Sequence, residues 1–149
     1  MAANINKILS GGVPSSLIKG VTAAKTDFAV IAAPADAADL ALIFTADTNG
    51  GFLDAIDLQI ATDNTNATQT ATVMNIWMTD TDGTNARVIK SIDIAGQAAT
   101  STTKGGYWLQ IVLNYNNIEA GRIIYVSFTV LVTHIVFNVT GWGGQFTAQ

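Results

Sequence analysis

The segment Tyr107-Trp108-Leu109-Gln110-Ile111-Val112-Leu113-Asn114-Tyr115 alternates between two kinds of side chain. Its odd-numbered positions are all large and apolar or aromatic, whereas Gln110 and Asn114 hold even-numbered positions. Successive side chains of a β-strand point to opposite faces of its sheet, so this alternation predicts a strand with the odd-numbered residues in the core. The fold class of the chain depends on how often the same pattern returns.

Three other segments repeat this alternation with the same period of two. The side chains that we expect to face the core are Ile56, Leu58 and Ile60 in residues 54–60, Ile124, Val126, Phe128, Val130 and Val132 in residues 122–132, and Ile135, Phe137 and Val139 in residues 135–140. Weaker runs cover residues 29–33, 39–45, 70–79 and 87–94. About eight short strands, separated by turn sequences such as Asn49-Gly50-Gly51, predict an all-β fold, an antiparallel β-sandwich that is jelly-roll-like.

The start of the chain lacks this alternation. Residues 14–25 have room for one short helix, with Pro14 in its first turn. We therefore expect residues 1–25 to form an N-terminal arm and residues 26–149 to form one β-sandwich domain. Within that domain, residues 95–104 are rich in Ala, Thr and Ser and predict a polar loop.

The composition excludes several classes of protein. The 149 residues carry a net charge of −4, and an acidic chain lacks the basic face that nucleic-acid binding requires. Cysteine is absent, which rules out disulfides, thiolate metal sites and thiol catalysis. The most apolar stretch, residues 123–139, contains interrupting polar side chains and many β-branched residues, so it predicts strands in place of a membrane span. We expect neither nucleic acid nor a membrane among the partners.

The sequence shows no arrangement of residues that is typical of an active site. Glu119 is the only glutamate, and His134 has no neighbouring serine or acid that would complete a triad, so a structural histidine is the favoured interpretation. Residues 80–85 place oxygen ligands at alternate positions, as a calcium loop does, but they lack its flanking helices and final glutamate. Asp, Asn and Gly also suit a hairpin turn, which we prefer. We expect no enzymatic activity, no cofactor and no metal.

Three tryptophans, Trp77, Trp108 and Trp142, are out of phase with the apolar residues of their own predicted strands. Large apolar side chains on an outer sheet face indicate that the arm or a second subunit covers that face. A β-bulge that exchanges the two faces is the alternative. We expect the tryptophans to contact other chains together with apolar residues of the arm, namely Ile5, Ile8, Leu9, Leu17 and Ile18.

Three segments carry a resemblance to a known group of proteins. Residues 41–51, ALIFTADTNGG, are similar to the LFTAxxNGG segment of small virion proteins of tailed bacteriophages. Residues 71–80, ATVMNIWMTD, resemble the ATVxxIWxxD strand that follows in that group, and residues 138–146, NVTGWGGQF, resemble its C-terminal NVTxxGGxF segment. Gln145 stands where that pattern has an acidic residue.

The resemblance implies a β-sandwich structural subunit of a phage particle, a capsid decoration protein without catalytic residues. The implied partners are the major capsid protein and further copies of the chain, which would form a trimer at a capsid three-fold axis. The implied location is the virion, assembled in the host cytoplasm. A tail-associated or carbohydrate-binding β-sandwich module, with the same tryptophans as a platform for sugar rings, is the alternative.

Overall fold

The computed structural model describes residues 19–21, 40–62, 67–81, 85–99 and 107–146. These residues form ten strands and no helix. The strands are β1 (Lys19–Val21), β2 (Ala41–Thr45), β3 (Gly51–Thr62), β4 (Ala67–Gln69), β5 (Thr72–Thr79), β6 (Arg87–Ile94), β7 (Gln97–Ala99), β8 (Tyr107–Ile118), β9 (Ile123–Phe128) and β10 (Ile135–Gln145). Every strand pair is antiparallel, which confirms the predicted all-β, antiparallel fold. No helix in the described part has the length and apolar character that crossing a membrane requires.

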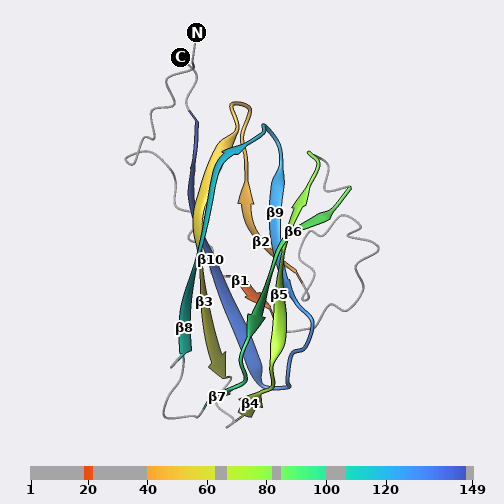
Figure 1. Cartoon of the computed structure of the whole chain (residues 1–149), viewed down its shortest axis with the longest axis vertical. Helices are drawn as coiled ribbons and strands as arrows, with labels where there is room; N and C mark the ends of the chain where they lie inside the picture. The colour runs from red at the N-terminus through yellow and green to blue at the C-terminus, as the bar shows by residue number, and fades with distance from the viewer. Residues whose placement is uncertain (1–18, 22–39, 63–66, 82–84, 100–106, 147–149) are drawn as a thin grey trace.

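The strands form two layers (Figure 1). The first sheet has the order β1-β10-β3-β8, and the second sheet has the order β2-β9-β5-β6. β4 and β7 form a separate two-stranded sheet at one end of the sandwich (Figure 1). The sandwich therefore has eight strands in its two main layers.

The strand pairs are nested along the chain. β1 pairs with β10, β2 with β9, β3 with β8, β4 with β7, and β5 with β6. The chain thus behaves as one long hairpin whose tip is the connection between β5 and β6. Two additional pairings, β3 with β10 and β5 with β9, join the nested pairs into the two sheets.

The main core fills the space between the two sheets. Ile56, Leu58 and Ile60 are at most 1% exposed, and the rings of Phe128 and Phe137 stack with centroids 4.0 Å apart. The side chains predicted to face the core are buried in β3, in β9 up to Phe128, and in β10, which confirms these predictions. Burying these side chains contributes about 1.5–3 kcal/mol each to the stability of the folded chain.

The inward position predicted for Val130 is wrong, because β9 ends at Phe128 and Val130 is 41% exposed. Beyond Phe128 two threonine hydroxyls replace backbone partners. Thr129 Oγ1 accepts from the Val73 amide at 3.1 Å, and Thr72 Oγ1 accepts from the Val130 amide at 2.9 Å. The chain leaves the sheet here, so the period of two no longer applies.

Two short strands lie where the sequence predicts other structure. β1 falls in the segment expected to hold a helix, and its residues pair with Phe137, Asn138 and Val139 of β10. The first sheet therefore includes three residues that the sequence assigned to the arm. β7 falls in the predicted polar loop of residues 95–104. Strands of three residues are too short to show a period, and tertiary pairing decides their conformation. The weak run at residues 29–33 lies outside the described residues.

Candidate functional site

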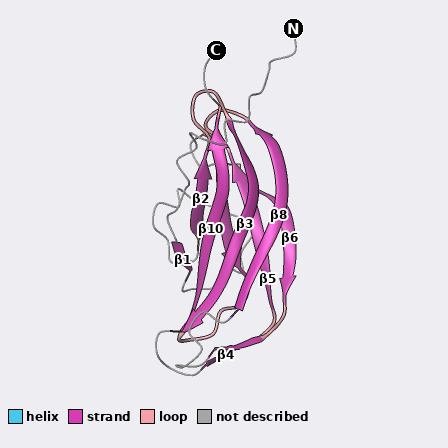
Figure 2. Cartoon of the chain, turned by 90° about the vertical axis from the view of Figure 1, so that its left-hand side faces the viewer, coloured by secondary structure: helices cyan, strands magenta, loops and turns pink. Residues whose placement is uncertain are grey.

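The outer face of the first sheet carries a mostly polar surface. β10, β3 and β8 run side by side (Figure 2), and their register arranges residues of the three strands in rows. The rows are Trp142–Ala55–Val112, Thr140–Asp57–Gln110 and Asn138–Gln59–Trp108. In β3 these positions alternate with the buried Ile56 and Leu58, so the rows belong to the face directed away from the core. We call this surface the Trp142 face.

Asp57 lies in the middle of the Trp142 face and accepts two hydrogen bonds. The indole Nε1 of Trp142 donates to Asp57 Oδ2, and Gln110 Nε2 donates to Asp57 Oδ1 at 3.0 Å. Trp142 is 46% exposed and Val112 is 57% exposed, while Ala55 between them is 8% exposed. The bond to Asp57 therefore holds the indole toward β3 while nearly half of the Trp142 side chain remains open to solvent.

Asp57 and Gln110 are functional candidates that the sequence did not single out. They are 53 positions apart in the chain, and only the register of β3 and β8 makes them neighbours. The alternation of each strand places both residues on an outer face, but it does not say which strands pair. The outward parity predicted for Trp142 is confirmed by its exposure.

Trp77 also points away from the main core, but it is not available to another molecule. Its side chain is 2% exposed, and its Nε1 donates to Ser127 Oγ at 2.8 Å. With Leu40 and Tyr125 it forms a second apolar cluster on the outer side of the second sheet. The prediction that Trp77 points away from the core residues of its strand is confirmed. Its expected contact with another chain is wrong, because this chain itself buries the ring.

The other predicted contact residues lie outside the described part of the structure. The apolar arm residues Ile5, Ile8, Leu9, Leu17 and Ile18 all precede β1. Trp108 occupies a backbone position opposite Gln59 in the pairing of β8 with β3, and its side chain is outside the description. Contacts of these six residues with other chains stay predictions.

The glycine-rich segments around Gly50-Gly51 and Gly143-Gly144 meet at one end of the sandwich. Gly51 pairs with Gln145, and Phe52 pairs with Gly144, in the register of β3 with β10. A Cβ atom added to Gly143 would lie 2.2 Å from the carbonyl oxygen of Phe52, so the close approach of the two strands requires glycine. The glycines of residues 41–51 and 138–146 therefore allow the two strands to pack closely.

The side-chain amide of Gln145 both accepts and donates a hydrogen bond within the fold. Its Oε1 accepts from the Asp47 amide at 2.9 Å, and its Nε2 donates to the Thr45 carbonyl oxygen at 2.7 Å. An ionised carboxylate at this position would have no proton to donate to the Thr45 carbonyl. The departure from the expected acidic residue therefore adds one hydrogen bond between β10 and the end of β2.

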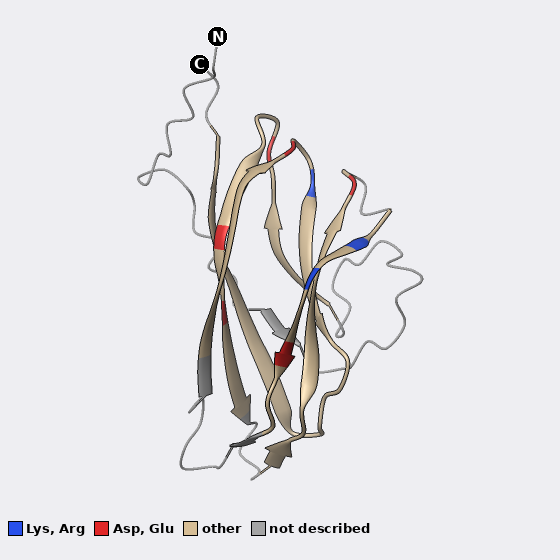
Figure 3. Cartoon of the chain, viewed as in Figure 1, with Lys and Arg blue, Asp and Glu red and all other residues tan. Residues whose placement is uncertain are grey.

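The loop considered for calcium has its first carboxylate engaged by protein donors. Arg122 pairs with Asp80 Oδ1, and Asn85 Nδ2 donates to Asp80 Oδ2 at 2.6 Å. Arg122 also pairs with Glu119 at 3.0 Å. Figure 3 shows acidic and basic positions together at the end of the sandwich where β9 begins. Residues 82–84 lie outside the described part, and no group of three or more potential metal ligands occurs among the residues described. These contacts favour the turn interpretation.

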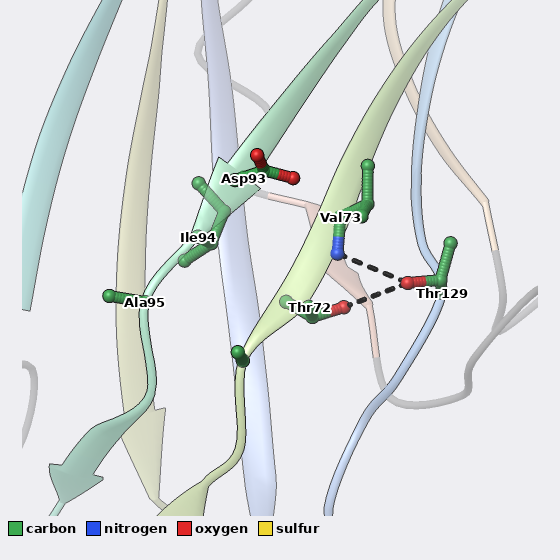
Figure 4. A pocket seen from close by; sticks show the side chains of 7 residues that line it. Thr72, Val73, Asp93, Ile94, Ala95 and Thr129 are labelled. Atoms are coloured by element: carbon green, nitrogen blue, oxygen red, sulfur yellow. Dashed lines mark hydrogen bonds between the residues drawn. The ribbon is translucent and has the colours of Figure 1, made fainter.

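A shallow cavity of about 360 Å³ lies near the start of β5 and the end of β6. Its lining residues are Ala71, Thr72, Val73, Asp93, Ile94, Ala95 and Thr129. Figure 4 shows the Thr72 and Thr129 hydroxyls directed toward each other, and their oxygens lie 3.4 Å apart. Both hydroxyl oxygens already accept hydrogen bonds from backbone amides, so these two hydroxyls hold the strand ends together.

Comparisons with known proteins assign no family to this chain. No protein-family model matches it, and searches of curated proteins and of solved structures found no match.

Proposed function

We propose that the chain is a non-enzymatic structural protein of a bacteriophage particle. In this proposal it decorates the capsid shell and stabilises it through homo-oligomeric contacts between β-sandwiches. Its partners are the major capsid protein and other copies of itself, arranged as a trimer at a three-fold axis of the capsid. It resides in the virion, which is assembled in the host cytoplasm.

The nested strand pairing is the observation that carries this proposal. Eight strands remain in the two main sheets when the small β4-β7 sheet is set aside, and their pairs enclose one another along the chain. We infer from this order that the sandwich is a jelly roll, an architecture common in viral capsid and lectin domains. The fold supports a structural role by analogy, since a fold by itself does not define a function.

The resemblance to phage virion proteins adds independent support. Its first and third segments, residues 41–51 and 138–146, form the glycine-rich strand contact described above. Its second segment, residues 71–80, contains β5. A protein that binds only the assembled shell stabilises that shell by mass action, and this role requires a rigid scaffold with contact surfaces and no reactive groups.

Co-sedimentation of the purified chain with capsids of the phage that encodes it tests this function. We expect saturable binding, a higher melting temperature of the decorated capsid, and a trimer mass in size-exclusion chromatography with light scattering. A variant that lacks residues 1–18 leaves β1 in place and tests the arm. We expect it to keep the β-sheet signal in circular dichroism and to bind capsids more weakly. A monomer that ignores capsids contradicts the proposal.

A carbohydrate-binding or tail-associated module is the second candidate. Jelly rolls also occur in lectins, and the exposed Trp142 beside the Asp57 carboxylate is the specific observation that favours sugar binding. Detection of the chain in purified tails, and not in purified heads, would favour a tail-associated module over capsid decoration.

A further inference from the structure

The geometry of the Trp142 face points to a binding site for a neutral saccharide. We propose that a pyranose ring stacks on the exposed part of the Trp142 indole while its hydroxyls donate hydrogen bonds to Asp57. This site rests on the carbohydrate-binding candidate named above and specifies its ligand, and it can exist with or without the capsid role.

The indole of Trp142 is held in place before any ligand arrives. Its register partner on β3 is Ala55, and its Nε1 bonds Asp57, two residues further along β3. The ring is therefore directed over β3, where the small Ala55 is 8% exposed. A side chain that is already oriented loses little rotational freedom on binding, which favours affinity. The 46% of Trp142 that stays exposed provides an apolar surface for the C–H face of a sugar ring.

Asp57 retains acceptor capacity for hydroxyl groups. An ionised carboxylate offers about four acceptor positions on its two oxygens. The structure gives one bond to each oxygen, from Gln110 Nε2 to Oδ1 and from Trp142 Nε1 to Oδ2. One acceptor position therefore remains on each oxygen, and two adjacent sugar hydroxyls present two donors at matching spacing. Hydrogen bonds to a charged acceptor are stronger than those between neutral groups.

The charge of the strands selects against acidic sugars. Across their described ranges, β3, β8 and β10 carry two charged residues, Asp54 and Asp57, and both are acidic. Lys90 from β6 reaches the edge of this sheet, where its ammonium donates to the Val112 carbonyl oxygen at 3.2 Å. This bond engages the Lys90 ammonium at the edge strand, and the described residues of the three strands themselves hold no cation, so a neutral ligand fits best beside Asp57.

The pattern of polarity favours a saccharide over a protein partner. The most exposed apolar side chains described on this face are Trp142 and Val112, which lie in a single row, while Val136 and Ala61 further along β10 and β3 are partly buried. The next row, Thr140–Asp57–Gln110, is polar and centres on a carboxylate. The centre of a stable protein interface is depleted in charged residues, because an unpaired buried carboxylate is costly. A sugar supplies hydroxyl donors to that carboxylate and leaves its edges in water.

The test is equilibrium binding of the full chain to gluco-, manno-, galacto- and N-acetylglucosamine pentasaccharides, with sialyllactose and oligogalacturonate as acidic probes. We expect saturable binding to at least one neutral probe and none to the acidic probes. Trp142→Ala should weaken this binding by at least about tenfold. Asp57→Asn keeps an oxygen that accepts from Trp142 but removes the charge, and should weaken binding by about three- to tenfold. Trp142→Phe keeps a ring without the N–H and should fall between wild type and Trp142→Ala.

Val88→Thr is the matched control, because Val88 is 38% exposed on β6 of the second sheet and its replacement has the same shape. It should bind like wild type, and circular dichroism should confirm that every variant is folded. The proposal is overturned if no neutral probe binds, if acidic probes bind as tightly, or if Trp142→Ala and Asp57→Asn bind like wild type. Loss of capsid binding in Trp142→Ala, with no sugar binding by the wild type, would identify the face as a protein contact. Failure of capsid binding alone would leave the saccharide site standing.

Discussion

Trp77 and Trp142 both point outward, from opposite sheets of the sandwich, yet their surroundings differ. Each points away from the main core, and each donates its indole N–H to a polar side chain. Trp77 on the second sheet is 2% exposed and bonds the hydroxyl of Ser127, which is itself 0% exposed. Trp142 on the first sheet is 46% exposed and bonds the carboxylate of Asp57.

The chemical nature of the hydrogen-bond acceptor explains this difference. A buried hydroxyl that accepts a hydrogen bond costs little, whereas a buried carboxylate costs several kcal/mol unless it is fully paired. Ser127 is therefore compatible with a closed face, and Asp57 is compatible with a face that stays in contact with water. The acceptor beside an outward tryptophan thus indicates whether the sheet face around it is closed or open.

Removal of the Trp77 ring should have the largest effect on stability. Trp77→Ala deletes a buried side chain and should lower the free energy of unfolding by about 3–5 kcal/mol. Urea denaturation followed by circular dichroism measures this loss. A loss below about 1 kcal/mol would mean that the second sheet has no closed outer face in solution.

Removal of the hydroxyl beside Trp77 should have an intermediate effect. Ser127→Ala leaves the Trp77 N–H without this acceptor, and an unsatisfied buried donor costs about 1–3 kcal/mol. Comparison of Ser127→Ala in the wild-type background and in the Trp77→Phe background isolates the bond, since Phe has no N–H. Equal losses in both backgrounds would contradict the proposed contribution of this hydrogen bond.

Tyr125 reports on the closed face through its titration. Burial raises the pKa of the Tyr125 phenol above its ordinary value of 10.0, because the folded state disfavours the charged form. The unfolded chain therefore releases this proton at lower pH than the folded chain. The stability that the neutral phenol contributes is present below pH about 10 and is lost as the pH rises toward the folded pKa. Unfolding measured between pH about 8 and 11 should show this decline, and Tyr125→Phe should flatten it.

Removal of the Trp142 ring should have the smallest effect on stability. Trp142→Ala acts on a half-exposed side chain and should change the free energy of unfolding by less than about 1 kcal/mol. The same urea titration used for Trp77→Ala provides a direct comparison. A loss as large as that of Trp77→Ala would show that the Trp142 face is covered in solution, and its dependence on protein concentration would identify a second copy as the cover.

The sequence predicted which residues face the core more reliably than it predicted what covers the other side. The period of two placed Ile56, Leu58 and Phe137 inside, because burial on one face imposes alternation directly on a strand. The same alternation marked Trp77 and Trp142 alike, since parity carries no information about a second layer. The pairing of Asp57 with Gln110 was also out of reach, because register between distant strands depends on tertiary packing.

The nested pairing has a consequence for how the chain reaches its native state. The contact nearest in sequence is the one between β5 and β6, while β1 and β10 join segments near opposite ends of the chain. Loop-closure entropy rises with the length of chain enclosed, and topologies with high contact order fold slowly. During synthesis the hairpin tip can assemble early, but Lys19 cannot pair until Val139, 120 positions later in the sequence, has been made. The growing chain therefore carries an unpaired strand edge in the meantime.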